Sequence, residues 1–233
     1  MRRFRRDKAR LKICVPIMER TTAATLEKIK EANRIGDLIE LRVDSLKTPS
    51  LEELLRAGKK PCIVTNRRKE EGGKFAGEER ERLTILKEAC VLGAAYADVE
   101  LESGKRFLQE MVACRRETRL ILSSHDFQKT SSRRELENLL RRMIRCGADM
   151  VKIVTYAKSF EDNLNVLSLI PLARKQGQKI LSFAMGEKGR MSRIFAPFLG
   201  AAWTYAALEK KRASAPGQLT VQEMKSIWEY MNR

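Results

Sequence analysis

Two side chains in the middle of the chain could carry out covalent and acid-base chemistry. Lys152 stands inside the apolar run 150–154, where an ammonium group is costly to bury unless it is neutralised or paired. His125, the single histidine of the chain, directly follows another apolar run. A desolvated lysine amine can attack a carbonyl and form an imine, and an imidazole transfers protons near neutral pH. Two other interpretations stay open here: a lysine paired with an interior carboxylate such as Glu40 or Glu100, and a structural histidine.

The elements around these side chains are predicted to be repeated strand-helix units. Short apolar runs rich in β-branched residues alternate with stretches of helical periodicity. The predicted strands are 12–17, 37–43, 62–66, 96–101, 119–124, 150–155, 179–184 and, least defined, 197–200. The predicted helices are 21–34, 51–57, 78–92, 103–116, 133–146, 160–175, 188–195 and 220–231.

Helix start signals support these boundaries. In a capping box, a hydroxyl stands three residues before a carboxylate, and each side chain accepts from the other residue's backbone N–H. Three pairs have this spacing: Ser50 with Glu53, Ser132 with Glu135, and Thr220 with Glu223. We therefore expect helices to begin at these three points.

Eight such units in 233 residues predict an α/β fold, a single-domain (β/α)8 TIM barrel. We expect a basic N-terminal leader over 1–11 and the catalytic barrel over 12–233. An open doubly wound sheet is the alternative, although no Gly-rich dinucleotide fingerprint follows the first strand. The eighth unit is the weakest, since 201–208 fits a helix as well as it fits a strand.

In a parallel barrel, active-site groups lie at the carboxyl ends of the strands. His125 ends the fifth predicted strand and Lys152 lies in the sixth, so the two should share one pocket. Glu40, Arg42 and Asp44 alternate with apolar residues in the second strand and should face the interior together. An exposed edge strand would show the same alternation, but a closed barrel has no edge.

Two late segments could bind an anion. Arg193 follows the seventh strand, and the loop 214–218 (Ser-Ala-Pro-Gly-Gln) follows the eighth. Barrels commonly bind anionic groups in this region, and an arginine fork can hold a carboxylate through two hydrogen bonds. A surface arginine and an ordinary Pro-Gly turn are equally compatible with these residues.

The net charge of +17 allows a nucleic-acid-binding module as an alternative function. Residues 1–12 contribute +6 of that charge, and the remainder is spread over predicted helix faces without interleaved aromatic residues. We therefore favour solvated helix surfaces and predict no nucleic-acid partner.

The remaining composition predicts a cytoplasmic protein without metal or cofactor. No run reaches the roughly 18 apolar residues that a membrane span needs, and no export signal opens the chain, so we predict no membrane partner. The five cysteines are widely spaced and form no C-x-x-C pair, which favours reduced thiols. One histidine without clustered cysteines makes a zinc site improbable.

Taken together, several segments resemble the type I 3-dehydroquinate dehydratases. The resemblance covers about residue 12 to the C-terminus, and each fragment is weak alone but their order is specific. The fragments are Glu40-Leu41-Arg42-Val43-Asp44, Thr65-Asn66-Arg67 with Glu71-Gly72-Gly73, Asp98-Val99-Glu100-Leu101, Ser124-His125-Asp126-Phe127, Val151-Lys152, Ser192-Arg193 and Ser214-Ala215-Pro216-Gly217-Gln218. The chain departs from the family's usual pattern at Asn66, where an aromatic residue is common, and at Gly200-Ala201-Ala202.

The resemblance implies a lyase that converts 3-dehydroquinate to 3-dehydroshikimate by syn elimination. Lys152 would form the Schiff base, His125 would act as general acid and base, and Glu71 would orient the histidine. The implied substrate-binding residues are Glu40, Arg42, Arg67, Arg193, Ser214 and Gln218, with Arg193 holding the substrate carboxylate. The resemblance also implies a homodimer. The alternative is another Schiff-base barrel enzyme of the aldolase type, which would also use a lysine on the sixth strand.

Overall fold

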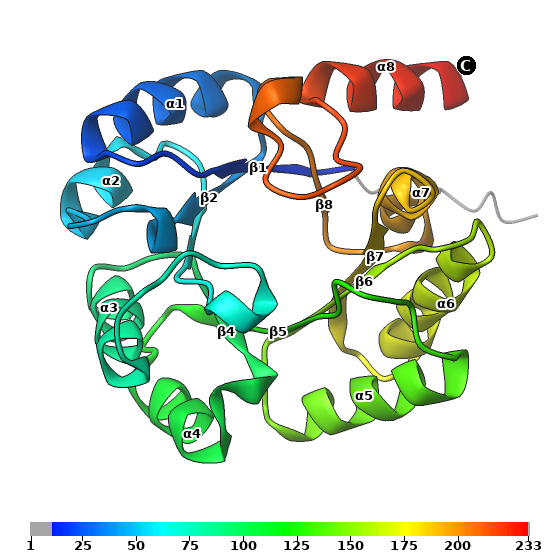
Figure 1. Ribbon diagram of the computed structural model, residues 1–233, viewed down its shortest axis with the longest axis horizontal. Helices are drawn as coiled ribbons and strands as arrows, with labels where there is room; N and C mark the ends of the chain where they lie inside the picture. The colour runs from blue at the N-terminus through cyan, green and yellow to red at the C-terminus, as the bar shows by residue number, and fades with distance from the viewer. Residues whose placement is uncertain (1–10, 233) are drawn as a thin grey trace, which may run out of the picture.

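The computed structural model describes residues 11–232, which form a (β/α)8 barrel (Figure 1). Within that range, eight parallel strands follow the order β7-β6-β5-β4-β3-β2-β1-β8. The strands are β1 (Ile13–Ile17), β2 (Leu38–Arg42), β3 (Cys62–Thr65), β4 (Tyr96–Glu100), β5 (Arg119–His125), β6 (Met150–Tyr156), β7 (Lys179–Met185) and β8 (Thr204–Tyr205). Residues 1–10 of the predicted leader lie outside the described range.

Helices surround the strands on the outside of the barrel, as Figure 1 shows in a view into its centre. They are α1 (Thr22–Ile35), α2 (Leu51–Ala57), α3 (Glu79–Val91), α4 (Lys105–Cys114), α5 (Arg133–Arg145), α6 (Asp162–Lys175), α7 (Arg190–Leu199) and α8 (Val221–Met231). Short 3-10 turns follow several strands: η1 (Val43–Ser45), η2 (Lys69–Glu71), η3 (Leu101–Ser103) and η4 (Lys210–Arg212).

The predicted helix starts are confirmed at all three positions, and the capping box at two of them. Ser132 with Glu135 and Thr220 with Glu223 form capping boxes at α5 and α8. At the third position α2 begins as predicted, with Ser50 as its N-cap, but Ser50 makes no side-chain cap hydrogen bond, so the capping box predicted there was wrong.

The eighth strand is not where the sequence predicts it. Residues 197–200 form the end of α7 and its left-handed cap at Gly200, whereas β8 lies at Thr204–Tyr205. Pro197 lacks the N–H that would bond the Arg193 carbonyl in a regular helix. The Thr204 hydroxyl donates to that carbonyl at 2.8 Å, so the proline is accommodated inside α7. The alternative helix over 201–208 is also wrong.

The barrel closes at β8, which pairs with β1 on one side and is joined to β7 by a backbone hydrogen bond on the other. β1 pairs with β2 and with β8, and the Ala202 N–H donates to the Ile180 carbonyl at 3.0 Å beside β7. An open doubly wound sheet would not place the first strand between the second and the last in this way, so the barrel prediction is confirmed.

Apolar residues pack in two separate cores, because strand side chains alternate between the outside and the inside of the barrel. The larger core lies between strands and helices and includes Val15, Leu41 and Val151. The smaller core fills the barrel interior and includes Ile63, Ile121 and Leu181. Towards the carboxyl ends of the strands, charged residues take the place of apolar ones at the interior positions, and the site lies there.

Candidate active site

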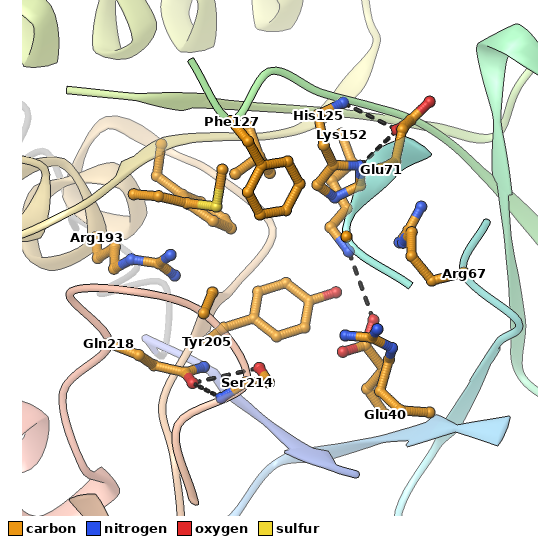
Figure 2. Close-up of a pocket in the computed structure, with 16 residues that line it drawn as sticks. Glu40, Arg67, Glu71, His125, Phe127, Lys152, Arg193, Tyr205, Ser214 and Gln218 are labelled. Carbon is orange, nitrogen blue, oxygen red and sulfur yellow. Dashed lines mark hydrogen bonds and ion pairs between the residues drawn. The ribbon is translucent and has the colours of Figure 1, made fainter. Parts of the chain in front are cut away.

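The structure brings all nine predicted site residues to one cavity at the carboxyl ends of the strands (Figure 2). Lys152 and Glu40 come from strands, whereas Glu71, Ser214 and Gln218 come from the segments that follow strands. Figure 2 shows Arg193 and Gln218 on one side of the cavity, and Lys152, Glu71 and Arg67 on the other. The complete set of predicted residues in the lining is Glu40, Arg42, Arg67, Glu71, His125, Lys152, Arg193, Ser214 and Gln218.

The Lys152 side chain is buried and ion-paired. Its Nζ lies 2.9 Å from Asp98 Oδ2 and 3.4 Å from Glu40 Oε1. The same nitrogen sits 4.8 Å from the centre of the Tyr205 ring, which forms the floor of the cavity beneath it. The sequence allowed a pairing with Glu40 or Glu100. The structure confirms the first and replaces the second with Asp98.

Asp98 is held between two cations. Its Oδ2 lies 2.9 Å from Arg67 Nη2 and 2.9 Å from Lys152 Nζ, and its Oδ1 accepts from the Ser123 hydroxyl at 2.6 Å. Burial favours a higher pKa for this carboxyl, but the charges of Arg67 and Lys152 outweigh burial and hold the pKa of Asp98 well below its usual range. The carboxylate therefore stays ionised and fixes the direction of the amine.

Strand register explains why these groups meet. Glu100, Ser123 and Lys152 are register partners on β4, β5 and β6, so their side chains emerge at one level on the interior face. Arg67 bridges this layer, since Nη1 lies 2.8 Å from Glu100 Oε1 and donates to Ser123 Oγ at 2.7 Å.

His125 forms a close pair with Glu71. Glu71 Oε2 lies 2.8 Å from His125 Nδ1 and accepts the backbone N–H of the same histidine at 3.0 Å. Burial raises the pKa of Glu71 to about 7. Burial, followed by the charges of Arg67 and Lys152, lowers the pKa of His125 well below its usual range. The imidazole is therefore neutral at physiological pH, and Nδ1 is occupied by the carboxylate.

Two glycines allow Glu71 to reach the histidine. Gly72 has a φ of 78°, a left-handed conformation that glycine adopts without strain, and the Phe127 ring packs where its Cβ would stand. A Cβ on Gly73 would lie 1.8 Å from the Arg67 carbonyl oxygen. Any larger side chain would push η2 away from the barrel mouth.

Arg42 and Glu40 are fixed by local partners. Arg42 donates from Nε and Nη2 to the two oxygens of Asp44 at 2.8 and 2.9 Å. Thr65 Oγ1 donates to Glu40 Oε1 at 2.9 Å. The predicted alternation is confirmed for Glu40 and Arg42, which line the cavity while Ile39, Leu41 and Val43 pack in the outer core. Asp44 is buried in η1 beside Arg42.

Arg193 is a buried cation with free donors. It is 1 % exposed, and its Nε and Nη2 have no hydrogen-bond partner among residues 11–232. The guanidinium carbon lies 4.6 Å from the centre of the Phe183 ring. Burial lowers the pKa of Arg193 to about 10, so the group is still charged at neutral pH. An unpaired buried cation in a cavity is a strong attractor for an anion.

The loop 214–218 packs against the end of β7. Gln218 Oε1 accepts from the Ser214 backbone N–H at 2.9 Å, and the Gly186 N–H donates to the Pro216 carbonyl at 3.1 Å. Gly217 has a φ of 76°, and a Cβ there would lie 2.0 Å from the Gly186 carbonyl oxygen. This contact holds Ser214 and Gln218 at the rim of the cavity.

Sequence reasoning assigned no role to Asp98 or Tyr205, and it considered Glu100 only as a partner of Lys152. Asp98 and Glu100 alternate with apolar residues in β4 as Glu40 and Arg42 do in β2, so the same pattern could have identified them. Tyr205 lies in 201–208, the segment for which the sequence left strand and helix open. Among the described residues, no group of three or more His, Cys, Asp or Glu could hold a metal ion, and the described helices include none that could cross a membrane.

These features define a (β/α)8-barrel enzyme with an acid-base pair and a buried lysine at the mouth of the barrel. The family model of the type I 3-dehydroquinases matches residues 13–233. The chain therefore belongs to the type I 3-dehydroquinase family.

Individual proteins agree with this assignment. The chain is 37% identical over 224 residues to a 3-dehydroquinate dehydratase of Methanocaldococcus jannaschii, covering 94% of this chain and 99% of that protein. It is 37% identical over 222 residues to one of Desulfotalea psychrophila, covering 93% and 96%. The solved type I 3-dehydroquinate dehydratase of Clostridium difficile superposes with a TM-score of 0.87 at 30% identity, covering 95% of this chain and 92% of that one.

Proposed function

We propose that this enzyme converts 3-dehydroquinate to 3-dehydroshikimate by syn elimination of water through a Schiff base on Lys152. The observation that carries the proposal is the placement of Lys152, His125 and the unpaired Arg193 around one cavity. The membership of the type I 3-dehydroquinase family supports the choice of substrate.

Covalent chemistry begins at Lys152. The amine, after losing a proton, attacks the C3 ketone carbon, and departure of one water leaves an iminium ion. The positive nitrogen withdraws electrons from the neighbouring carbon, so the proton on C2 becomes far more acidic. Asp98 and Glu40, which already contact Nζ, stabilise the positive charge of the iminium.

Proton transfer is assigned to His125. Its Nδ1 faces Glu71 at 2.8 Å, so Nε2 is the nitrogen free to accept the C2 proton. The resulting enamine expels the C1 hydroxyl, and the imidazolium returns the proton to that leaving group, releasing water. Hydrolysis of the conjugated iminium then frees the product and the lysine amine. One imidazole serving both steps requires the proton and the hydroxyl to leave from the same face, which is a syn elimination.

Substrate binding is assigned to the remaining residues of the lining. Arg193 holds the carboxylate at C1, because its free donors face the cavity opposite the lysine. Glu40, Arg42 and Arg67 contact the substrate from the opposite side, and Ser214 with Gln218 closes the rim so that water is excluded from the iminium.

Dehydration beside a ketone creates a conjugated enone, so the reaction can be followed by ultraviolet absorbance. We expect turnover of 3-dehydroquinate by the natural chain and by Lys175→Met, an exposed lysine at the end of α6. Lys152→Met should be inactive. Turnover of sugar phosphates by carbon-carbon cleavage, without dehydration of 3-dehydroquinate, would favour the aldolase-type alternative.

We also propose four properties that the site does not determine. A homodimer is expected, and light scattering of the purified protein tests it. Cytoplasmic location is tested by cell fractionation, and the absence of nucleic-acid binding by titration at physiological salt. The division into a leader over 1–11 and a catalytic barrel over 12–233 predicts that a chain starting at Lys12 keeps full activity.

A further inference from the structure

Arg82 lies on α3, in the outer layer of the barrel, yet its side chain is 0 % exposed. Its guanidinium carbon sits 5.0 Å from the centre of the Phe107 ring on α4. From this position the guanidinium group, called the fork below, points inwards to the end of β4. Burying an arginine so far from the cavity is costly unless its charge and its donors are fully used.

All the donors of the Arg82 fork are used. Nη1 donates to Glu100 Oε2 at 2.6 Å and to the Asn66 carbonyl at 2.9 Å. Nη2 donates to Glu79 Oε1 at 2.8 Å and to Ser103 Oγ at 2.6 Å, and Nε donates to Glu79 Oε2 at 2.8 Å. The fork therefore fixes the side chain of Glu100 relative to α3.

Glu100 divides its two oxygens between two arginines. Oε2 faces Arg82 at 2.6 Å, and Oε1 faces Arg67 at 2.8 Å. Because Arg82 occupies one oxygen, Arg67 gives only Nη1 to Glu100 and keeps Nη2 for Asp98 at 2.9 Å. Asp98 in turn contacts the Lys152 amine. Charges of alternating sign thus run from Glu79 through Arg82, Glu100, Arg67 and Asp98 to Lys152.

We infer that Arg82 is a positioning residue for imine formation, acting on Lys152 through Glu100, Arg67 and Asp98. The inference rests on the proposed function, since it concerns the step in which Lys152 attacks the ketone. Without the fork, Glu100 Oε2 has no cation beside it and competes for both Nη groups of Arg67. Asp98 is then left with Lys152 as its main partner, and the amine gives up its proton less readily.

Arg82→Met tests the inference, because methionine keeps the stem packed against Phe107 and removes the fork. We expect a fall in kcat of about tenfold or more with KM changed much less, since Arg82 does not line the cavity. The rate at which borohydride traps the substrate on Lys152 should fall in parallel, and its pH dependence should move to higher pH. Arg80→Met, an exposed arginine on the same helix, is the matched control and should behave as the natural chain.

The readouts separate positioning from simple support of the fold. If Arg82 only stabilised the barrel, the folded fraction of Arg82→Met would trap substrate at the natural rate and with the natural pH dependence, and that result overturns the inference. Should the variant not fold, Glu79→Gln decides: it weakens two of the fork's hydrogen bonds at a half-exposed position and should slow trapping by a few fold. An unchanged trapping rate in Glu79→Gln would equally overturn it. Failure of the natural chain to form any adduct would instead reject the proposed function.

Discussion

Two buried arginines at the mouth of the barrel have opposite environments. Arg67 faces Asp98 and Glu100 within 2.9 Å, whereas Nε and Nη2 of Arg193 have no partner among the described residues. Burial works to lower the pKa of Arg67, but Asp98 and Glu100 outweigh it and raise that pKa above its usual value. Burial lowers the pKa of Arg193 to about 10 with no carboxylate to compensate.

The difference divides the cavity into two halves. We call the charged lining residues Glu40, Arg42, Arg67, Glu71, His125 and Lys152 the paired half. Their charges have protein partners before substrate arrives, so their positions are fixed for chemistry. Arg193 belongs to the open half, where a charge is left for the substrate. Substitutions in the paired half should act on kcat or on stability, and substitution of Arg193 should act on KM.

The largest effect within this comparison is expected for His125→Ala. Removing the general acid and base should lower kcat by ~10²–10⁴-fold. The imine should still form, because the nucleophile is a different residue, and mass spectrometry after borohydride treatment should find the adduct. Simultaneous loss of adduct and turnover would contradict the division of labour between His125 and Lys152.

Arg193→Met should raise KM by ~30–5000-fold with a smaller effect on kcat, since it removes a charged contact to the substrate worth ~2–5 kcal/mol. The same variant should be more stable. A depressed pKa marks a destabilising charge at every pH below about 10, and its removal should recover about 3 kcal/mol. Steady-state kinetics check the rise in KM, and thermal unfolding checks the gain in stability. A drop in melting temperature would indicate that Arg193 has structural partners after all.

Arg67→Met is the counterpart in the paired half and should have the opposite effect on stability. Loss of this cation leaves Asp98 and Glu100 buried with fewer partners, a penalty of ~3–5 kcal/mol. Thermal denaturation should therefore separate the two arginines clearly. Equal melting temperatures for Arg67→Met and Arg193→Met would remove the distinction between the halves.

Glu71→Gln is expected to have the smallest effect and to change the pH profile. Glu71 has a raised pKa of about 7, so protonation on acidification should lower kcat/KM as pH falls through about 7. Glutamine can still accept from Nδ1 but does not titrate. The acid limb is then set by His125, whose pKa is lowered, and should move to lower pH with a reduced plateau. An unmoved acid limb in kcat/KM would exclude Glu71 as its origin.

Part of this site was predictable because its residues break a local pattern, whereas Arg67 and Glu71 were predicted from the family resemblance alone. Lys152 interrupts an apolar strand, and Glu40 and Arg42 occupy interior positions of β2. Periodicity also identified the barrel, since the strands and helices are mostly long enough to show it. β8 was misplaced because a strand of two residues has no period, and because Pro197 sits inside α7, where a helix is not expected to continue.

Apart from the contact between Lys152 and Glu40, the pairing of charges was not predictable, because it depends on register between strands far apart in the chain. Asp98 and Lys152 are 54 residues apart, and Arg82 reaches Glu100 from a different layer. Nothing in the neighbouring sequence distinguishes Arg67, which pairs with carboxylates, from Arg193, whose Nε and Nη2 have no partner among the described residues. The contrast appears only when the barrel places Glu100 beside one and Phe183 beside the other.

The most direct test is peptide-level mass spectrometry of the natural chain after borohydride reduction in the presence of 3-dehydroquinate. We expect one reduced ligand adduct, located on Lys152 and absent when either reagent is omitted. An active, folded enzyme that gains no mass on Lys152, or that carries the adduct on another lysine, would contradict the covalent role assigned to this buried amine.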